Sequence, residues 1–245
     1  MTSGDHFQNF IQSYAALPAV GLDTIKEEKI KLITGIETAS SIRDYGGLWG
    51  VHGLYLIEGA KGLRCGFAQM VNRFNAGITP VEQYNEKVAE AQETLDCEFN
   101  FYKGDFRDTS IFYHFEKVDV SLLYEVILHQ ENYVQVIKNV IEKTNSHICF
   151  AQPMMKETLF TLPCSSALLQ FYPEELKDLI RYANWWDKEP PVETFDTRYW
   201  MWGQSISHIR AVFQGFGWEV AFQKVFEMSD HWVYALMRFA PKNLK

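Results

Sequence analysis

A glycine-rich stretch from Ser41 to Gly53 carries residue types that suit the binding of a small molecule. It reads Ser-Ile-Arg-Asp-Tyr-Gly-Gly-Leu-Trp-Gly-Val-His-Gly. Its three central glycines are Gly46, Gly47 and Gly50. Glycine lets the backbone approach a ligand closely, and a helix that begins after the turn, over residues 51–57, would present free N–H groups. We therefore expect this stretch to hold the carboxylate, hydroxyls or phosphates of a ligand.

Further polar side chains stand where apolar, strand-like runs of the sequence end. They are Gln69, Asp105, Tyr124, Glu125, His129, Gln130 and Gln152. The carboxyl ends of parallel strands face the ligand crevice of an α/β sheet, so these side chains are placed to reach a bound molecule. Among them, we expect Gln130 and Gln152 to contact a substrate.

His129 is the first candidate for a general base. An imidazole with an ordinary pKa of about 6.5 can take a proton from a hydroxyl nucleophile. His52 and His208 are poorer candidates, because the first falls on the helix after the glycine turn and the second on a late helix. The alternative for His129 is a histidine that hydrogen-bonds the backbone at a helix start. An acceptor that is already anionic would need no base at all.

The elements that must position these residues alternate along the chain. After a first helix at residues 22–34, the expected strands end at Asp44 and cover residues 63–71, 98–102, 118–127 and 147–151. The helices between them are expected at residues 51–58, 79–95 and 132–143. Five alternations of this kind predict an α/β fold with a doubly wound, mostly parallel sheet.

The last part of the chain adds a hairpin. A helix at residues 205–213 leads through a Gly-x-Gly turn to strands at residues 218–227 and 231–238. Only a short polar turn separates these two strands, so we expect them to pair antiparallel.

This order of elements resembles the class I S-adenosylmethionine-dependent methyltransferases over residues 42–238. The family's first motif is an acidic residue followed by alternating glycines, and here it reads Asp44-Tyr-Gly46-Gly-Leu48-Trp-Gly50, with Leu48 in place of the middle glycine. The resemblance implies a Rossmann-like sheet of seven strands, with the seventh antiparallel, and S-adenosylmethionine as the cofactor. It also implies that Asp44 orients the loop and that Gly46, Gly47 and Gly50 pass under the methionine part of the cofactor.

The resemblance extends to the next two strand ends. The family places an acidic side chain on the ribose hydroxyls at the end of the second strand, and this position falls near Gln69, with Asn72 as the other candidate. Asp105 matches the family aspartate that accepts a hydrogen bond from the adenine amino group. Phe106 matches the residue that packs beside the adenine ring, while the alternative for Asp105 is to cap a turn.

The fourth strand resembles the family as well. It ends Leu123-Tyr-Glu-Val-Ile-Leu-His129-Gln130, similar to many small-molecule methyltransferases in which a buried strand runs into a histidine just past its end. The backbone around Leu123 and Tyr124 would lie beside the methionine chain.

The alternation of strands and helices breaks at residues 155–204, which we expect to form an aromatic-rich insertion after strand 5. Tyr199, Trp200 and Trp202 belong to it and are expected to contact the substrate. Aromatic side chains shape a dry cavity and stabilise a sulfonium by cation–π contact, so the insertion would be a lid or an acceptor pocket. The alternative is a subunit interface of a homo-oligomer, because Trp and Tyr are also enriched at interfaces.

Composition excludes several classes of protein. With 245 residues, 47% of them hydrophobic, the chain suits a single domain over residues 1–245 with an N-terminal helical segment at residues 1–36. The net charge of −8 argues against a nucleic-acid partner. The four cysteines are widely spaced and indicate neither a metal site nor a disulfide framework. No apolar run approaches the roughly 20 residues that span a bilayer, and no signal peptide is evident, so we expect a cytoplasmic protein.

We expect an S-adenosylmethionine-dependent methyltransferase that acts on a small-molecule acceptor, at oxygen rather than nitrogen. Biosynthesis of a modified sugar, lipid or secondary metabolite would each be consistent with it. One rival is a non-catalytic binding or scaffold protein that keeps the fold, which Leu48 and Gln69 favour. A second rival, an RNA methyltransferase, is disfavoured by the acidic balance.

Overall fold

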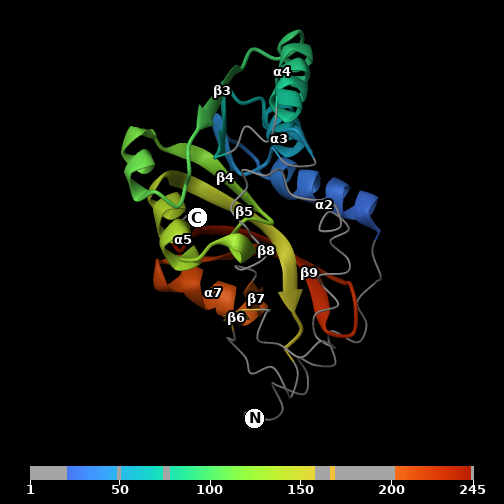
Figure 1. The fold of residues 1–245 in the computed structure, drawn as a ribbon, viewed down its shortest axis with the longest axis vertical. Helices are drawn as coiled ribbons and strands as arrows, with labels where there is room; N and C mark the ends of the chain where they lie inside the picture. The colour runs from blue at the N-terminus through green and yellow to red at the C-terminus, as the bar shows by residue number, and fades with distance from the viewer. Residues whose placement is uncertain (1–20, 49–50, 74–77, 158–165, 169–201, 244–245) are drawn as a thin grey trace.

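The computed structural model describes residues 21–48, 51–73, 78–157, 166–168 and 202–243. Its centre is a seven-stranded sheet with the strand order β3-β2-β1-β4-β5-β9-β8 (Figure 1). The strands are β1 (Ser41–Tyr45), β2 (Phe67–Asn72), β3 (Glu98–Lys103), β4 (Val118–Tyr124), β5 (Thr144–Met155), β8 (Trp218–Glu227) and β9 (Trp232–Pro241). β1 to β5 pair parallel, so their carboxyl ends meet at one edge of the sheet.

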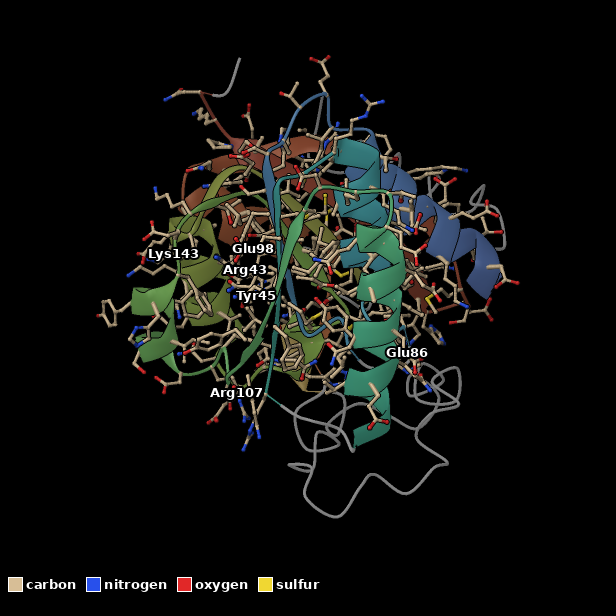
Figure 2. All side chains as sticks on the ribbon, turned by 90° about the horizontal axis from the view of Figure 1, so that it is seen from above. Arg43, Tyr45, Glu86, Glu98, Arg107 and Lys143 are labelled. Carbon is tan, nitrogen blue, oxygen red and sulfur yellow. The ribbon has the colours of Figure 1, made fainter. Side chains whose placement is uncertain are left out.

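Helices cover both faces of this sheet, as the alternation of elements predicts. On one face lie α2 (Leu22–Thr34), α3 (Leu54–Leu63) and α4 (Ile78–Gln92). On the other face lie the 3-10 helices η1 (Thr109–His114) and η2 (Ile127–His129), with α5 (Tyr133–Glu142) and α7 (Ile206–Gly215). Figure 2 shows the arrangement from above, with α4 and α2 on one side of β3 and α5 on the other. Each face has its own apolar core, so the sheet is buried on both sides.

The final hairpin is present as expected. β9 pairs antiparallel with β5 and with β8, so it is inserted between them. The turn between the strands is closed by the N–H groups of Met228 and Ser229, which both donate to the carbonyl of Trp232 at 3.1 Å. The prediction of a mostly parallel sheet with an antiparallel seventh strand is therefore confirmed.

Several boundaries of the predicted elements are wrong, among them the start of the second strand, which is Phe67 and not residue 63, and both ends of the fifth strand, which covers Thr144–Met155 and not residues 147–151. The helix after the glycine turn begins at Leu54, not residue 51, and passes Gly59 and Gly62 to end at Leu63. Gly59 is tolerated inside the helix because a Cβ there would lie 2.8 Å from Ile42 Cδ1 on the sheet. The fourth strand ends at Tyr124 and not at residue 127, because Glu125 has a φ of 57° and turns the chain out of the sheet.

The described part of the predicted insertion is a second, two-stranded sheet. β6 (Ser166–Leu168) pairs antiparallel with β7 (Trp202–Gln204). An isolated bridge between Met155 and Ser205 joins this region to the end of β5. Tyr199 and Trp200 lie outside the described residues. Among the described helices, none has both the length and the apolar character needed to cross a membrane.

Candidate functional site

The turn after β1 brings the backbone of Gly46 close to the end of β4. Gly46 has a φ of 91°, its N–H donates to the carbonyl of Val71 at 2.9 Å, and a Cβ at this position would lie 2.9 Å from Val126 Cγ2. Positive φ and close approach together require glycine. Leu48, which replaces a glycine of the family motif, is fully buried in the core on the α3 side. Gly50 lies outside the described residues.

Asp44 is a buried carboxylate beneath this turn. Its side chain lies near the end of β1, is 1% exposed, and neither carboxylate oxygen has a hydrogen-bond partner in the part of the chain that the structure describes. Burial raises the pKa of Asp44 to about 7, and the positive charge of Lys29 opposes this rise. A buried acceptor without a donor is costly, so Asp44 is a group that would gain from a donor supplied by a ligand or by a rearranged turn.

The prediction that Gln69 stands at the end of the second strand is wrong. We expected Gln69 at the end of the strand, but β2 continues to Asn72. Gln69 lies within the sheet, where it accepts a hydrogen bond from Arg43 Nε at 2.5 Å and donates to Asn100 Oδ1 at 3.2 Å. Asn72, the other candidate, is the residue at the carboxyl end, and it is 3% exposed.

The Arg43 side chain explains the position of Gln69. Arg43 is 1% exposed, donates to the carbonyl of Glu116 at 3.0 Å and lies over the ring of Phe115 at 4.5 Å. Figure 2 shows Arg43 and Tyr45 on the side of the sheet away from α4. Gln69 therefore satisfies a buried cation within the core.

The third strand end places Asp105 between two arginines. Arg107 donates to both carboxylate oxygens of Asp105, with the shortest distance of 2.6 Å to Oδ2, and Arg73 Nε lies 3.3 Å from the same oxygen. Figure 2 places Arg107 at the opposite end of β3 from Glu98, that is, at the carboxyl edge. Asp105 thus lies at the expected edge, and its carboxylate is oriented by Arg107 and Arg73.

Phe106, the next residue, packs on the first strand. Its ring meets the ring of Tyr45 edge-on, with centroids 6.0 Å apart, and it lies 3.8 Å from the position of a Cβ on Gly46. Phe106 is 8% exposed. The structure therefore brings the glycine turn after β1 and Phe106, which follows β3, into contact.

The fourth strand ends in a cluster that includes Lys29 of α2. Leu123 is fully buried on the α5 side, whereas the hydroxyl of Tyr124 faces α2 and donates to the carbonyl of Lys29 at 2.9 Å. The carboxylate of Glu125 accepts from the hydroxyl of Tyr234 at 2.6 Å, and Lys29 Nζ lies 3.1 Å from the same oxygen. Glu125 and Tyr124 thus belong to one polar cluster under the turn.

Sequence reasoning missed Lys29. Its side chain is 4% exposed, and its ammonium lies 4.8 Å from the ring centroid of Tyr55 and 5.5 Å from those of Tyr124 and Tyr234. The signal was present in the spacing, because Lys29 stands four residues from both Ile25 and Ile33 and shares their buried helix face.

His129 and Gln130 lie just after β4, as expected. Gln152 was expected after the end of the fifth strand, but β5 continues to Met155, so Gln152 lies inside the strand. His129 closes η2 and is partly buried, and its N–H donates to the carbonyl of Val126 at 3.1 Å. The indole of Trp202 donates to the carbonyl of Gln130 at 2.8 Å, so the structure brings these two predicted residues together. Gln152 is fully buried in β5 and donates to Gln204 Oε1 at 2.7 Å.

A second histidine contact lies beside this group. His208 Nε2 is 2.6 Å from the hydroxyl of Tyr133, and the ring of Tyr133 packs edge-on against Trp202 with centroids 5.4 Å apart. The pairing joins α5 to α7, which lie far apart in the sequence. Within the described ranges, no group of three or more His, Cys, Asp or Glu residues could hold a metal ion.

The strand order and the placement of the glycine turn define the class I S-adenosylmethionine-dependent methyltransferase fold. An O-methyltransferase family protein from Burkholderia thailandensis aligns with 90% of this chain and 57% of its own, at 11% identity and a TM-score of 0.56. This chain therefore spans little more than half the length of that protein.

Two further structures match more evenly. Magnesium protoporphyrin IX methyltransferase (ChlM) from Synechocystis PCC 6803, with bound SAH, aligns with 89% of this chain and 82% of its own, at 13% identity and a TM-score of 0.55. The N-methyltransferase NodS from Bradyrhizobium japonicum WM9, in complex with S-adenosyl-l-homocysteine, aligns with 96% of this chain and 97% of its own. The sequence identity is 10% and the TM-score is 0.54. No protein-family model matches the sequence. The search of curated proteins gives no match either.

Proposed function

We propose that the chain is an S-adenosylmethionine-dependent methyltransferase that transfers the methyl group to a small-molecule acceptor, at oxygen rather than nitrogen. The observation that carries the proposal is the turn at Asp44, Gly46 and Gly47, at the end of the first strand of a methyltransferase sheet. Structural neighbours crystallised with S-adenosylhomocysteine support the choice of cofactor.

The residues at the strand ends fit this cofactor. Gly46 holds the turn in a backbone conformation of positive φ, and Asp44 holds two buried carboxylate oxygens that lack donors among the described residues. Asn72, in place of Gln69, would accept from or donate to the ribose hydroxyls, as an amide can do both. Asp105 would accept a hydrogen bond from the adenine amino group.

When bound, the cofactor supplies a methyl group that is already activated on a sulfonium. The protein then has to align the acceptor and exclude water. His129, at the end of η2, is proposed to take the proton of a hydroxyl acceptor. Gln130, Gln152 and Trp202 are proposed to line the acceptor side.

The scaffold rival rests on Leu48 and Gln69, and the structure weakens both reasons. Leu48 is buried in the core, so its side chain does not extend over the turn. Gln69 lies inside the sheet and is hydrogen-bonded to Arg43, so we propose that Asn72 takes the ribose position instead. We also propose that nucleic acid is not the substrate, because the chain carries a net charge of −8.

Calorimetric titration of the purified protein with S-adenosylhomocysteine tests the proposal, with NAD as the control ligand. We expect a dissociation constant of about 1–100 μM for S-adenosylhomocysteine and no heat with NAD. Failure of both to bind would favour the scaffold rival. Binding of NAD alone would assign the turn to a different cofactor.

A further inference from the structure

Glu125 has a backbone conformation that is uncommon for a residue with a side chain. Its φ of 57° lies in the left-handed region, which is unfavourable for residues with a Cβ and is concentrated at functional sites. Its N–H donates to the carbonyl of Ala151 at 2.7 Å, so the backbone stays attached to the sheet while the side chain is redirected. The redirected side chain reaches Lys29 on α2 and Tyr234 on β9.

Among the described residues, hydrogen bonds reach one of the two carboxylate oxygens of Glu125. Tyr234 donates to Oε1 at 2.6 Å, and Lys29 Nζ lies 3.1 Å from that oxygen. The second oxygen, Oε2, makes no hydrogen bond to any residue in the described part of the chain. The side chain of Glu125 is 39% exposed, although that of Lys29 is 4% exposed. One oxygen is therefore fixed from the buried side and the other remains open to a ligand.

The position of Glu125 relates it to the glycine turn. Glu125 follows the last residue of β4, and its neighbour Val126 lies 2.9 Å from the position of a Cβ on Gly46. In the register of the sheet, Tyr124 pairs with Ala151 of β5, whereas β1 lies on the opposite side of β4. The carboxylate points toward β9 and α2, beyond β5, and so away from β2 and β3, where Asp105 lies.

We propose that Glu125 is the acceptor-binding carboxylate of the site and that the acceptor presents a hydroxyl or a protonated amine to Oε2. This inference rests on the proposed function. A fixed carboxylate accepts hydrogen bonds from such donors, and its charge repels an acceptor that carries a carboxylate. Lys29 and Tyr234 are positioning residues, because they hold Oε1 and thereby aim Oε2.

The test uses three probes of one shape, which are benzylamine, benzyl alcohol and benzoate. Each is titrated into the isotope-labelled protein, saturated with S-adenosylhomocysteine, and binding is followed by NMR chemical shifts. We expect benzylamine to bind at least about tenfold more tightly than benzoate, with benzyl alcohol between them. In Glu125→Gln this ratio should fall to about threefold or less, because the charge is lost while an acceptor for Tyr234 remains.

Two further variants control for charge and for positioning. Glu142→Gln removes one exposed carboxylate on α5, 60% exposed and 3.9 Å from Lys138, and should leave the ratio unchanged. Tyr234→Phe removes one donor to Oε1 without changing the charge and should reduce the ratio. Thermal unfolding of each variant shows that it is folded.

The inference is overturned if benzoate binds to the unmodified protein as tightly as benzylamine, or if the ratio survives in Glu125→Gln. It is also overturned if none of the three probes shifts any resonance at about 10 mM. Failure of S-adenosylhomocysteine to bind would instead count against the proposed function. The same three titrations on the protein without that ligand would then decide the role of Glu125 separately.

Discussion

A methyl group added at Gly47 would lie 1.9 Å from Oδ2 of Asp44, so the buried carboxylate lies directly against the backbone of the glycine turn. The space between the two residues is therefore closed to any side chain. The conformation of the turn therefore depends on the position of the Asp44 carboxylate. We expect changes at either residue to weaken ligand binding.

Gly47→Ala is expected to lower the free energy of unfolding by about 1–3 kcal/mol, because the added methyl group forces the turn or the carboxylate to move. It should also abolish binding of S-adenosylhomocysteine. Urea unfolding and calorimetry measure the two effects. Gly66→Ala is the matched control, since a Cβ there meets nothing within 4 Å, and a comparable loss in that variant would refute the steric explanation.

Asp44 should make the stability of the protein depend on pH. Burial raises its pKa from an ordinary value of 3.8 to about 7, so the folded chain keeps a proton that the unfolded chain has released. The contribution of Asp44 to the free energy of unfolding is fully present below pH about 4 and is lost as the pH rises toward about 7. The total loss is on the order of 2–4 kcal/mol. We expect Asp44→Asn to become progressively more stable than the unmodified protein across this window.

Urea unfolding at a series of pH values measures this difference, and titration of other groups cancels in it. Asp119→Asn serves as the control. Burial alone would raise the pKa of Asp119, but hydrogen bonds from Ser40 hold it below its ordinary value. The difference in free energy of unfolding between Asp119→Asn and the unmodified protein should therefore stay constant between pH about 5.5 and about 8. A flat difference for Asp44→Asn as well would mean that Asp44 is ionised in the folded protein.

Gln69 and Asn72 are expected to respond in opposite ways to substitution. Gln69→Leu leaves Arg43 Nε buried without its acceptor, so the free energy of unfolding should fall by about 1–3 kcal/mol with little change in affinity for S-adenosylhomocysteine. Asn72→Asp should tighten that affinity, because a carboxylate accepts more strongly than an amide from ribose hydroxyls. Calorimetry on both variants decides between the positions, and weaker binding in Gln69→Leu alone would reverse the assignment.

Asp105→Ala is expected to weaken binding of S-adenosylhomocysteine by about tenfold or more, through loss of the proposed hydrogen bond to the adenine amino group. Asp96→Ala, which removes an exposed aspartate just before β3, provides the control. Arg107 and Arg73 lose their shared partner in Asp105→Ala, so the thermal unfolding midpoint is measured in parallel. Unaltered affinity would show that Asp105 only orients the two arginines.

The fold was readable from the sequence because each element has a local signal. Helix α2 spans the residues at which Ile25 and Ile33 repeat with helical spacing, and β8 coincides with the predicted strand. The hairpin of β8 and β9 follows from a turn too short for a crossover. Errors arose where a single backbone angle decides the boundary, as at Glu125, because a left-handed φ at a non-glycine residue has no pattern in the sequence.

The site was harder to predict from the sequence than the fold, because its contacts join residues far apart in the chain. Lys29 on α2 contacts Glu125 and Tyr234, which lie far from it in the sequence. Gln69 on β2 is hydrogen-bonded to Arg43 on the neighbouring strand β1. The parallel order predicted that Asp105 and His129 follow strand ends, but it placed Gln69 and Gln152 at strand ends when both lie inside their strands. The contact partners of these polar side chains could not be predicted. Those contacts depend on how helices and strands pack, which their alternation along the chain does not determine.

His129 provides the test of general-base catalysis. If His129 takes the proton from a hydroxyl acceptor, His129→Gln should lower kcat by about 10²- to 10⁴-fold while the affinity for S-adenosylhomocysteine stays unchanged. His114→Gln, which changes an exposed histidine on η1, should retain kcat. An unchanged kcat in His129→Gln would leave His129 with a structural role at the end of η2 and would favour an acceptor that needs no base.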